Sequence, residues 1–276
     1  MLFNFKTSYL LVSFAFIVMA CGNNSEDELD SIDDKMQISG IDSQKISAQN
    51  VFNTISSRST IIEVAKLSGA EYNVQFLNNP DVVNNYSLES SQALNLGVYG
   101  ADLNAASIFD QTQETMLFFK CVNILAKRIG VSNSFDENMG DRMTNNQENR
   151  DSTLSIISQA FQSADITLRK NNRPGTSTLL VAGAWVEGIY IACQSAKENN
   201  SELIVKEIFL QKESLLNLIE LVKSSTISDE VKYISNDLNT IKSIFDAKIE
   251  GVNSLNSLSE LDKKIAELRT KIVSSK

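Results

Sequence analysis

Residues 178–199 read TLLVAGAWVEGIYIACQSAKEN. Between Leu179 and Cys193 this stretch is apolar on all sides of a helix, and its only charged residue is Glu187. A helix that is apolar all round is buried inside its fold. Gly183 and Gly188 lie in its interior, although glycine costs a helix about 1 kcal/mol relative to alanine. We therefore expect a central helix whose backbone closely approaches that of a neighbouring helix.

A second stretch, residues 95–103 (NLGVYGADL), also combines glycine and alanine with larger apolar residues and contains a single acid, Asp102. Asp102 and Glu187 both lie in apolar surroundings, and we expect Glu187 to be at least half buried. A buried carboxylate must be paired, hydrogen-bonded or protonated. The candidate partners are Arg128, Arg142 and Arg150, and Arg142 or Arg150 is the expected partner of Glu187.

These acids support three interpretations. The first is an ion pair or network that locks two tightly packed helices together. The second is the polar floor of a ligand pocket, with the candidate binding residues Tyr99, Asp102, Trp185, Glu187 and Tyr190. The third is a carboxylate-based hydrolase. It is the weakest, because acids on glycine-flanked helices inside a bundle are poorly placed to face a sugar.

Apolar residues recur at helical spacing along most of the chain, which contains 11 Gly and only 2 Pro. Such periodicity predicts an all-α fold: a bundle of about seven to eight helices forming one domain over residues 44–276. The expected helices cover residues 44–67 (in two pieces), 87–109, 111–129, 151–171, 178–199, 201–223, 228–250 and 257–276. The last two have short heptad-like stripes, which favours an antiparallel pair packed on the body.

The chain has no histidine, and its formal net charge is −9. The first fact excludes Ser-His-Asp and Cys-His catalysis and histidine-ligated metal or haem. The second argues against nucleic acid as a partner. Residues 136–141 (DENMGD) do not fit a calcium loop, because Gly140 falls at the fifth position and not the sixth. We therefore expect no cofactor and no metal. Cys121 and Cys193 are expected in helices, either as buried free thiols or as a disulfide.

The N-terminus has the features of an export signal. Lys6 precedes an uncharged apolar run, residues 10–20, that is too short to span a bilayer securely. Residues 18–21 (VMAC) then resemble the bacterial lipobox, which implies cleavage after residue 20 and lipidation of Cys21. An ordinary signal peptide followed by an incidental cysteine is the alternative. Loss of Lys6 with the signal, residues 1–20, would change the net charge from −9 to −10.

Residues 21–43 form the expected disordered acidic tether. Within it, Ser25, Glu26, Asp27 and Glu28 resemble the serine-plus-acids export signal of Bacteroidota-type lipoproteins. That resemblance implies an outer-membrane location with exposure at the cell surface. A solvated acidic tail on a periplasm-facing protein is the alternative.

Residues 51–194, through the two glycine-containing stretches and the helix start at Asp151, resemble a group of uncharacterised all-helical lipoproteins from such bacteria. This resemblance implies the fold and the lipid anchor but no activity and no site residues. We expect a non-catalytic binding or scaffold lipoprotein. It would be held at the membrane by its anchor and would bind an unidentified protein or small molecule.

Overall fold

The computed structural model describes residues 61–146, 149–247 and 255–274, which all belong to one compact unit. The prediction of an all-α fold is confirmed, since the described residues contain ten α-helices, four short 3-10 helices and no strand. The α-helices are α2 (Ile61–Leu67), α3 (Glu89–Ile108), α4 (Thr112–Arg128), α5 (Glu137–Asn145), α6 (Arg150–Lys170), α7 (Pro174–Glu198), α8 (Glu202–Leu210), α9 (Lys212–Ser224), α10 (Tyr233–Ala247) and α11 (Leu255–Ser274). The 3-10 helices are η1 (Val74–Phe76), η2 (Pro80–Asn85), η3 (Ser132–Ser134) and η4 (Asp229–Val231).

Helices α3 and α7 form the centre, and their backbones touch where the sequence places glycine. A Cβ added to Gly183 would lie 1.9 Å from the carbonyl oxygen of Leu94, and one added to Gly97 would lie 2.0 Å from that of Leu180. No side chain fits at such separations, so glycine at both positions sets the distance between the helices. Gly188 is different, because an added Cβ there would meet nothing within 4 Å.

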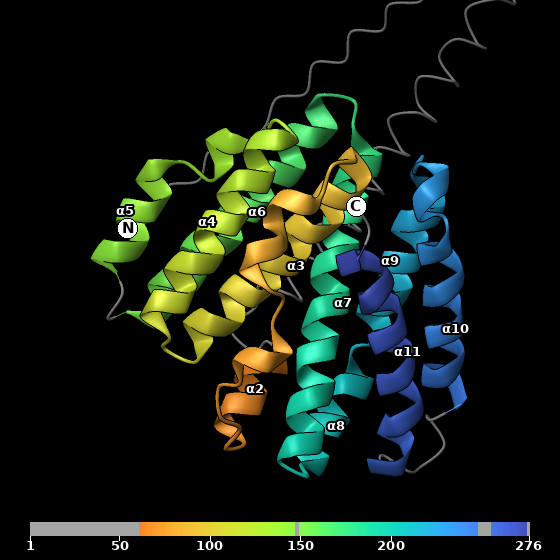
Figure 1. The fold of residues 1–276 in the computed structure, drawn as a ribbon. Coiled ribbons are helices and arrows are strands. Elements are labelled where there is room, and N and C mark those ends of the chain that lie inside the picture. The colour runs from red at the N-terminus through yellow and green to blue at the C-terminus, as the bar shows by residue number, and fades with distance from the viewer. Residues whose placement is uncertain (1–60, 147–148, 248–254, 275–276) are drawn as a thin grey trace, which may run out of the picture. The chain divides into compact units, whose positions relative to one another are not determined.

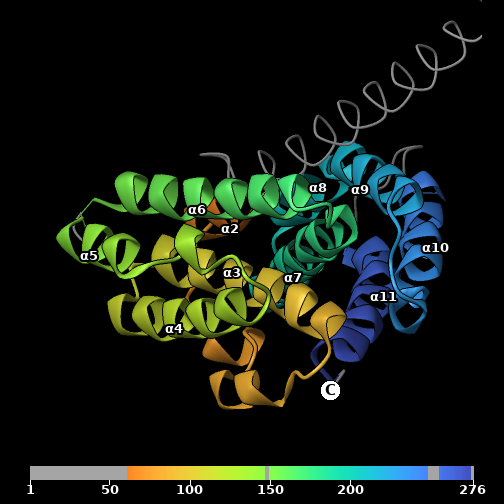
Figure 2. The same ribbon diagram turned by 90° about the horizontal axis from the view of Figure 1, so that it is seen from above.

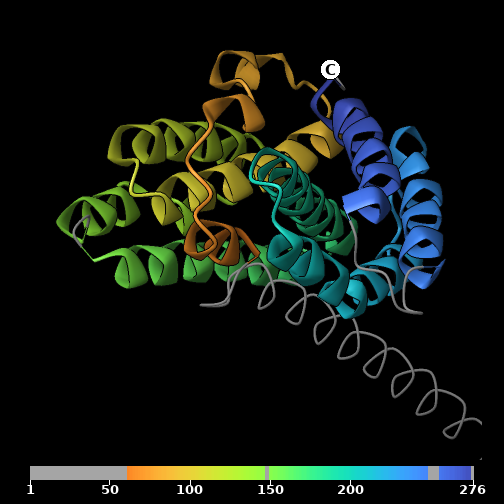
Figure 3. The same cartoon turned by 90° about the horizontal axis from the view of Figure 1, so that it is seen from below.

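The remaining helices flank this central pair. Helices α4, α5 and α6 lie on one side of α3 and α7, and α9, α10 and α11 lie on the other (Figures 1 and 2). Helix α2 packs against the pair and against α8, as the view from below shows (Figure 3). Helix α7 is long and apolar enough to cross a membrane by length and composition. However, 83% of its most apolar window is buried, as expected of a core helix.

The apolar stripes predicted for the outer helices face the core. The stripe residues of α8 to α10 are at most 5% exposed: Ile204, Ile208, Leu215, Ile219, Val222, Val231, Ile234, Leu238, Ile241 and Phe245. Those of α11 are fully buried: Leu258, Leu261, Ile265, Leu268 and Ile272. Two helices were not predicted separately. The expected helix over residues 201–223 is divided into α8 and α9 at Gln211. Helix α5 lies between the expected helices over residues 111–129 and 151–171, where no helix was predicted. The Asp136 side chain accepts a hydrogen bond from the Met139 N–H and so caps the start of α5.

Helices α10 and α11 form the predicted antiparallel pair. Lys271, near the end of α11, lies 2.7 Å from the carboxylate of Asp237, near the start of α10. This contact joins the end of one helix to the beginning of the other. Helix α11 also packs along α7 and α3, so it belongs to the core as well as to the pair (Figure 1).

Both described cysteines, Cys121 and Cys193, are free and buried, so the disulfide alternative is not realised. Burial raises the pKa of the Cys121 thiol to about 11 and that of Cys193 well above its usual value. Both are inert packing groups under physiological conditions. The predicted signal peptide, Cys21 and the Ser25–Glu28 motif lie outside the described residues.

Candidate functional site

The Glu187 carboxylate is fully buried in the core and forms an ion pair with Arg269 of α11. The Arg269 Nε donates to Oε2 at 2.6 Å and its Nη2 donates to Oε1 at 2.7 Å. The Glu187 side chain is 0% exposed and that of Arg269 is 14% exposed. Two parallel bonds between a guanidinium and a carboxylate form the strongest common ion-pair geometry. Expected burial of Glu187 is therefore confirmed.

The expected partners of Glu187 were wrong. Arg128 binds the main-chain carbonyls of the η2 segment and the side chain of Asn84, and Arg142 reaches Gln159 at 3.4 Å. Arg150 contacts Glu63, also at 3.4 Å. All three lie on the α4–α6 side of the molecule, whereas Glu187 faces α11 on the opposite side. Only tertiary packing decides which face of α7 meets which arginine.

Asp102 is a second fully buried acid near Glu187. Its Oδ2 accepts a hydrogen bond from the Asn78 main-chain N–H at 3.2 Å, while its Oδ1 accepts no hydrogen bond from a donor among the described residues. Burial raises the pKa of Asp102 well above its usual range, and the neighbouring negative charge of Glu187 raises it further, although Arg269 opposes both effects.

A proton on Asp102 resolves this arrangement. The raised pKa favours the protonated form of Asp102, whose carboxyl can then donate a hydrogen bond toward the neighbouring Glu187 carboxylate. The cluster of Asp102, Glu187 and Arg269 then has no net charge, since one cation balances one anion. Burial alone would lower the pKa of Arg269, but the Glu187 carboxylate outweighs it, so the guanidinium stays charged. We call these three residues the buried triad.

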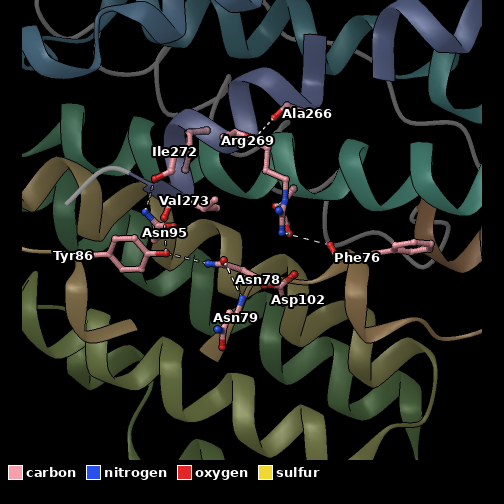
Figure 4. A network of polar contacts seen from close by, with 12 residues as sticks. Phe76, Asn78, Asn79, Tyr86, Asn95, Asp102, Ala266, Arg269, Ile272 and Val273 are labelled. Carbon is pink, nitrogen blue, oxygen red and sulfur yellow. Dashed lines mark hydrogen bonds and ion pairs between the residues drawn. The ribbon is translucent and has the colours of Figure 1, made fainter. Parts of the chain in front are cut away.

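Further hydrogen bonds attach α11 to the segment before α3 and to α3 itself. The Asn78 side chain donates to the Tyr86 hydroxyl at 3.1 Å, and that hydroxyl donates to the Val273 carbonyl at 3.2 Å. The Asn95 side chain donates to the Ile272 carbonyl at 3.1 Å. Figure 4 shows these contacts, together with the Arg269 side chain extending from α11 toward the Phe76 carbonyl, 3.5 Å away.

The structure brings together only some of the five candidate binding residues. Tyr190 belongs with the triad, because its ring lies 4.2 Å below the Arg269 guanidinium, within cation–π distance. The Tyr99 hydroxyl donates a hydrogen bond to the Asn79 main-chain carbonyl at 2.7 Å. Trp185 points elsewhere and donates to Ser214 of α9 at 2.9 Å. Residues two apart on a helix face different ways, so Trp185 cannot form a wall beside Glu187.

Three hollows lined by described residues lie away from the triad. One of about 100 Å³ lies where the ends of α3, α4, α5 and α6 meet, one of about 360 Å³ lies beside the starts of α3 and α7, and a groove of about 780 Å³ runs between α9 and α10. None of the three is lined by a triad residue, Tyr99, Trp185 or Tyr190. Among the described residues there is also no group of three metal-ligating acids or cysteines.

Comparisons with protein-family models, curated proteins and solved structures find no match to this chain. The geometry of the triad therefore has to be interpreted from its chemistry alone. Two fully buried carboxyl groups beside an arginine are suited to holding helices together. They have no free oxygen directed at solvent with which to attack or protonate a substrate.

Proposed function

We propose that this protein is a lipid-anchored component of the bacterial cell envelope whose helical body is a non-catalytic scaffold. The observation that carries the proposal is the run of residues 10–21, an apolar segment that ends in VMAC. Acylation of Cys21 would give stable membrane attachment when more than one chain is added. The acidic residues that follow would hold the body away from the membrane surface.

The enclosed triad supports a structural role for the two acids over the two rival functions. A hydrolase of the glycosidase type needs two carboxylates that flank a bound substrate, separated by several ångströms of accessible space. Glu187 has both oxygens bound to Arg269 and is 0% exposed. A ligand pocket at Glu187 would need the same access. The partner of the scaffold is accordingly expected to be a protein that contacts its outer surface.

Surface exposure is the finer part of the proposal. It rests on Ser25, Glu26, Asp27 and Glu28, which follow Cys21 after three intervening residues. The strongly acidic mature chain disfavours nucleic acid and anionic lipid as partners, since like charges repel. A periplasm-facing protein with the same anchor is the alternative location.

Fractionation of cells that express two cysteine variants tests the anchor. Cys21→Ser should move the protein from the membrane to the soluble fraction, because no acyl chain can be attached. Cys121→Ala is the matched control and should stay in the membrane, since its thiol is buried in the body. Membrane association that survives in Cys21→Ser contradicts the proposal.

Two triple variants then test export. Replacing Glu26, Asp27 and Glu28 with alanine should keep the protein in the membrane but protect it from protease added to intact cells. Replacing Asp30, Asp33 and Asp34 removes the same charge outside the motif and should leave the protein accessible. Equal accessibility of both variants would assign the acids to a solvated tether only.

A further inference from the structure

Helices α8 and α9 carry a row of exposed residues on the outside of the body. The two helices follow one another through Gln211 and lie at the outer edge of the molecule, beside α10 (Figure 2). Exposed residues recur along them at every third or fourth position, the spacing of one helical face. We call this row the outer stripe, and its five members are Leu203, Lys206, Leu210, Glu213 and Leu216.

The leucines of the outer stripe are exposed to a degree that is uncommon in this protein. Their exposed fractions are 53% for Leu203, 59% for Leu210 and 38% for Leu216. Among the described residues, eight large apolar side chains are exposed, and these two short helices hold three of them. A single exposed leucine needs no explanation, but a row of them bordered by charged residues is typical of a surface that contacts another protein.

The two charged members of the outer stripe are available to another chain. Within the part of the chain that the structure describes, neither Lys206 nor Glu213 forms an ion pair, whereas the neighbouring Lys212 is paired with Asp246 at 2.8 Å. In chain order the stripe reads Leu, Lys, Leu, Glu, Leu. Read in reverse, the same stripe places a glutamate where the forward direction has a lysine, so the stripe is complementary to itself.

We infer that the outer stripe binds the outer stripe of a second copy of this chain, with the two helices antiparallel. A two-fold axis beside Leu210 places Leu203 against Leu216 of the second copy. It also places Lys206 against Glu213 of the second copy, and the symmetry repeats each pair. A parallel arrangement would instead bring lysine to lysine and glutamate to glutamate, which like-charge repulsion disfavours. The inference uses only the helical body and does not depend on the lipid anchor.

The groove between α9 and α10 gives α8 of the second copy a place to pack. Its volume is about 780 Å³, and it is lined by Leu216 and Ile219 of α9 and by Asn239 and Ser243 of α10, among others. Because Leu203 of the second copy lies opposite Leu216, its side chain would enter the groove next to these two apolar residues. The groove and the outer stripe therefore form one continuous contact surface.

The small size of this surface implies a weak association. We expect three leucines on each side to bury less than the roughly 1,200 Å² in total at which stable interfaces begin. The net charge of −9 opposes the approach of two copies. However, charges separated by more than about 8 Å are largely screened at physiological ionic strength. The opposite charges within the stripe meet at shorter range, and they select the antiparallel register.

Disulfide trapping of the full-length chain in cells tests the inference, because a covalent bond retains a weakly associated pair. The variant Leu210→Cys places a thiol beside the two-fold axis. Oxidation by oxygen, with copper–phenanthroline as catalyst, should therefore join two chains into a dimer on a non-reducing gel. Leu117→Cys is the matched control and should stay monomeric, since Leu117 is also an exposed leucine but lies on α4. Cys121 and Cys193 are buried and should not react.

Charge exchange in the Leu210→Cys protein then tests the register. Lys206→Glu and Glu213→Lys should each lower the initial rate of dimer formation by at least about fivefold, because two attractive pairs become repulsive. Combining the two substitutions should restore the rate. Both positions are exposed, so each variant should keep the melting temperature of its parent within about 2 °C.

Three results would overturn the inference. The first is the absence of a dimer from Leu210→Cys, or an equal amount of dimer from Leu117→Cys. The second is a rate that neither single charge reversal lowers, or that the combined variant does not recover. The third is a crosslinked product that contains a different protein, which would assign the outer stripe to that protein and not to a second copy.

Discussion

Replacing Glu187 with alanine should destabilise the protein severely, because it removes one partner of a fully buried ion pair. Arg269 would keep its charge in the core, with a side chain that is only 14% exposed. Loss of one partner of a buried pair typically costs about 3–5 kcal/mol. For a body of this size, that corresponds to a fall in melting temperature of roughly 6–20 °C. Asp102 can ionise and partly replace the lost anion, so we expect the lower half of the range.

Thermal melts followed by circular dichroism, together with urea unfolding, measure this cost. Glu198→Ala is the matched control on the same helix, because Glu198 is exposed and its carboxylate accepts a single side-chain hydrogen bond among the described residues, from Asn73 at 3.0 Å. It should change stability by less than about 0.5 kcal/mol. The double variant Glu187→Ala, Arg269→Met should recover much of the loss, since no unpaired charge remains in the core.

Two results would refute this reasoning. A melting temperature of Glu187→Ala within about 2 °C of the wild type would mean that the pair contributes little to stability. It would favour the ligand-binding interpretation of Glu187, since binding sites are often built at some cost in stability. A double variant no more stable than the single one would mean that the lost stability comes from packing and not from the stranded charge.

Two further predictions concern the proton and the glycines. Asp102→Asn keeps a donor toward Glu187 but cannot titrate. Because the folded pKa of Asp102 is raised, the wild type retains a proton that the unfolded chain releases above pH 3.8. The stability advantage of the wild type over Asp102→Asn should therefore fall with rising pH, by up to about 1.4 kcal/mol per pH unit, until the folded carboxyl ionises. If urea unfolding gives the same difference in free energy of unfolding between the two proteins from about pH 5 to 9, Asp102 does not keep its proton in the folded state. Gly183→Ala should destabilise by about 1–3 kcal/mol or more through the clash with Leu94, whereas Gly188→Ala, with open space around it, should stabilise by up to about 1 kcal/mol in the same assay.

The sequence by itself determined most of the helices, α5 excepted, and the inward faces of their apolar stripes. Apolar residues at 3.6-residue spacing need no tertiary information, because burial of one face is a property of the helix alone. The stripes of α10 and α11 are buried as predicted. The close contact of α3 and α7 also followed from the sequence, since Gly97 and Gly183 have a cost inside a helix that tight packing offsets, whereas Gly188 makes no such contact.

Helix boundaries were less predictable where the sequence signal is weak. The division of α8 from α9 at Gln211 has no glycine or proline to mark it. Helix α5 is short and polar on most of its surface, so its residues have the composition of a loop. Its capping residue, Asp136, was visible in the sequence, but an acid at that position also suits a turn.

Tertiary structure alone decided the composition of the buried triad. The sequence indicated that Asp102 and Glu187 are buried and need compensation, because the apolar residues around them exclude water. The sequence could not indicate Arg269 as the partner, because Arg269 is 82 residues from Glu187. Arg269 is the only arginine after Arg173, but that fact alone does not place it beside Glu187. Which arginine reaches a buried acid depends on how the helices are arranged around α7. Local sequence periodicity specifies the buried face of a helix, but the partner on that face is fixed only when the chain is packed.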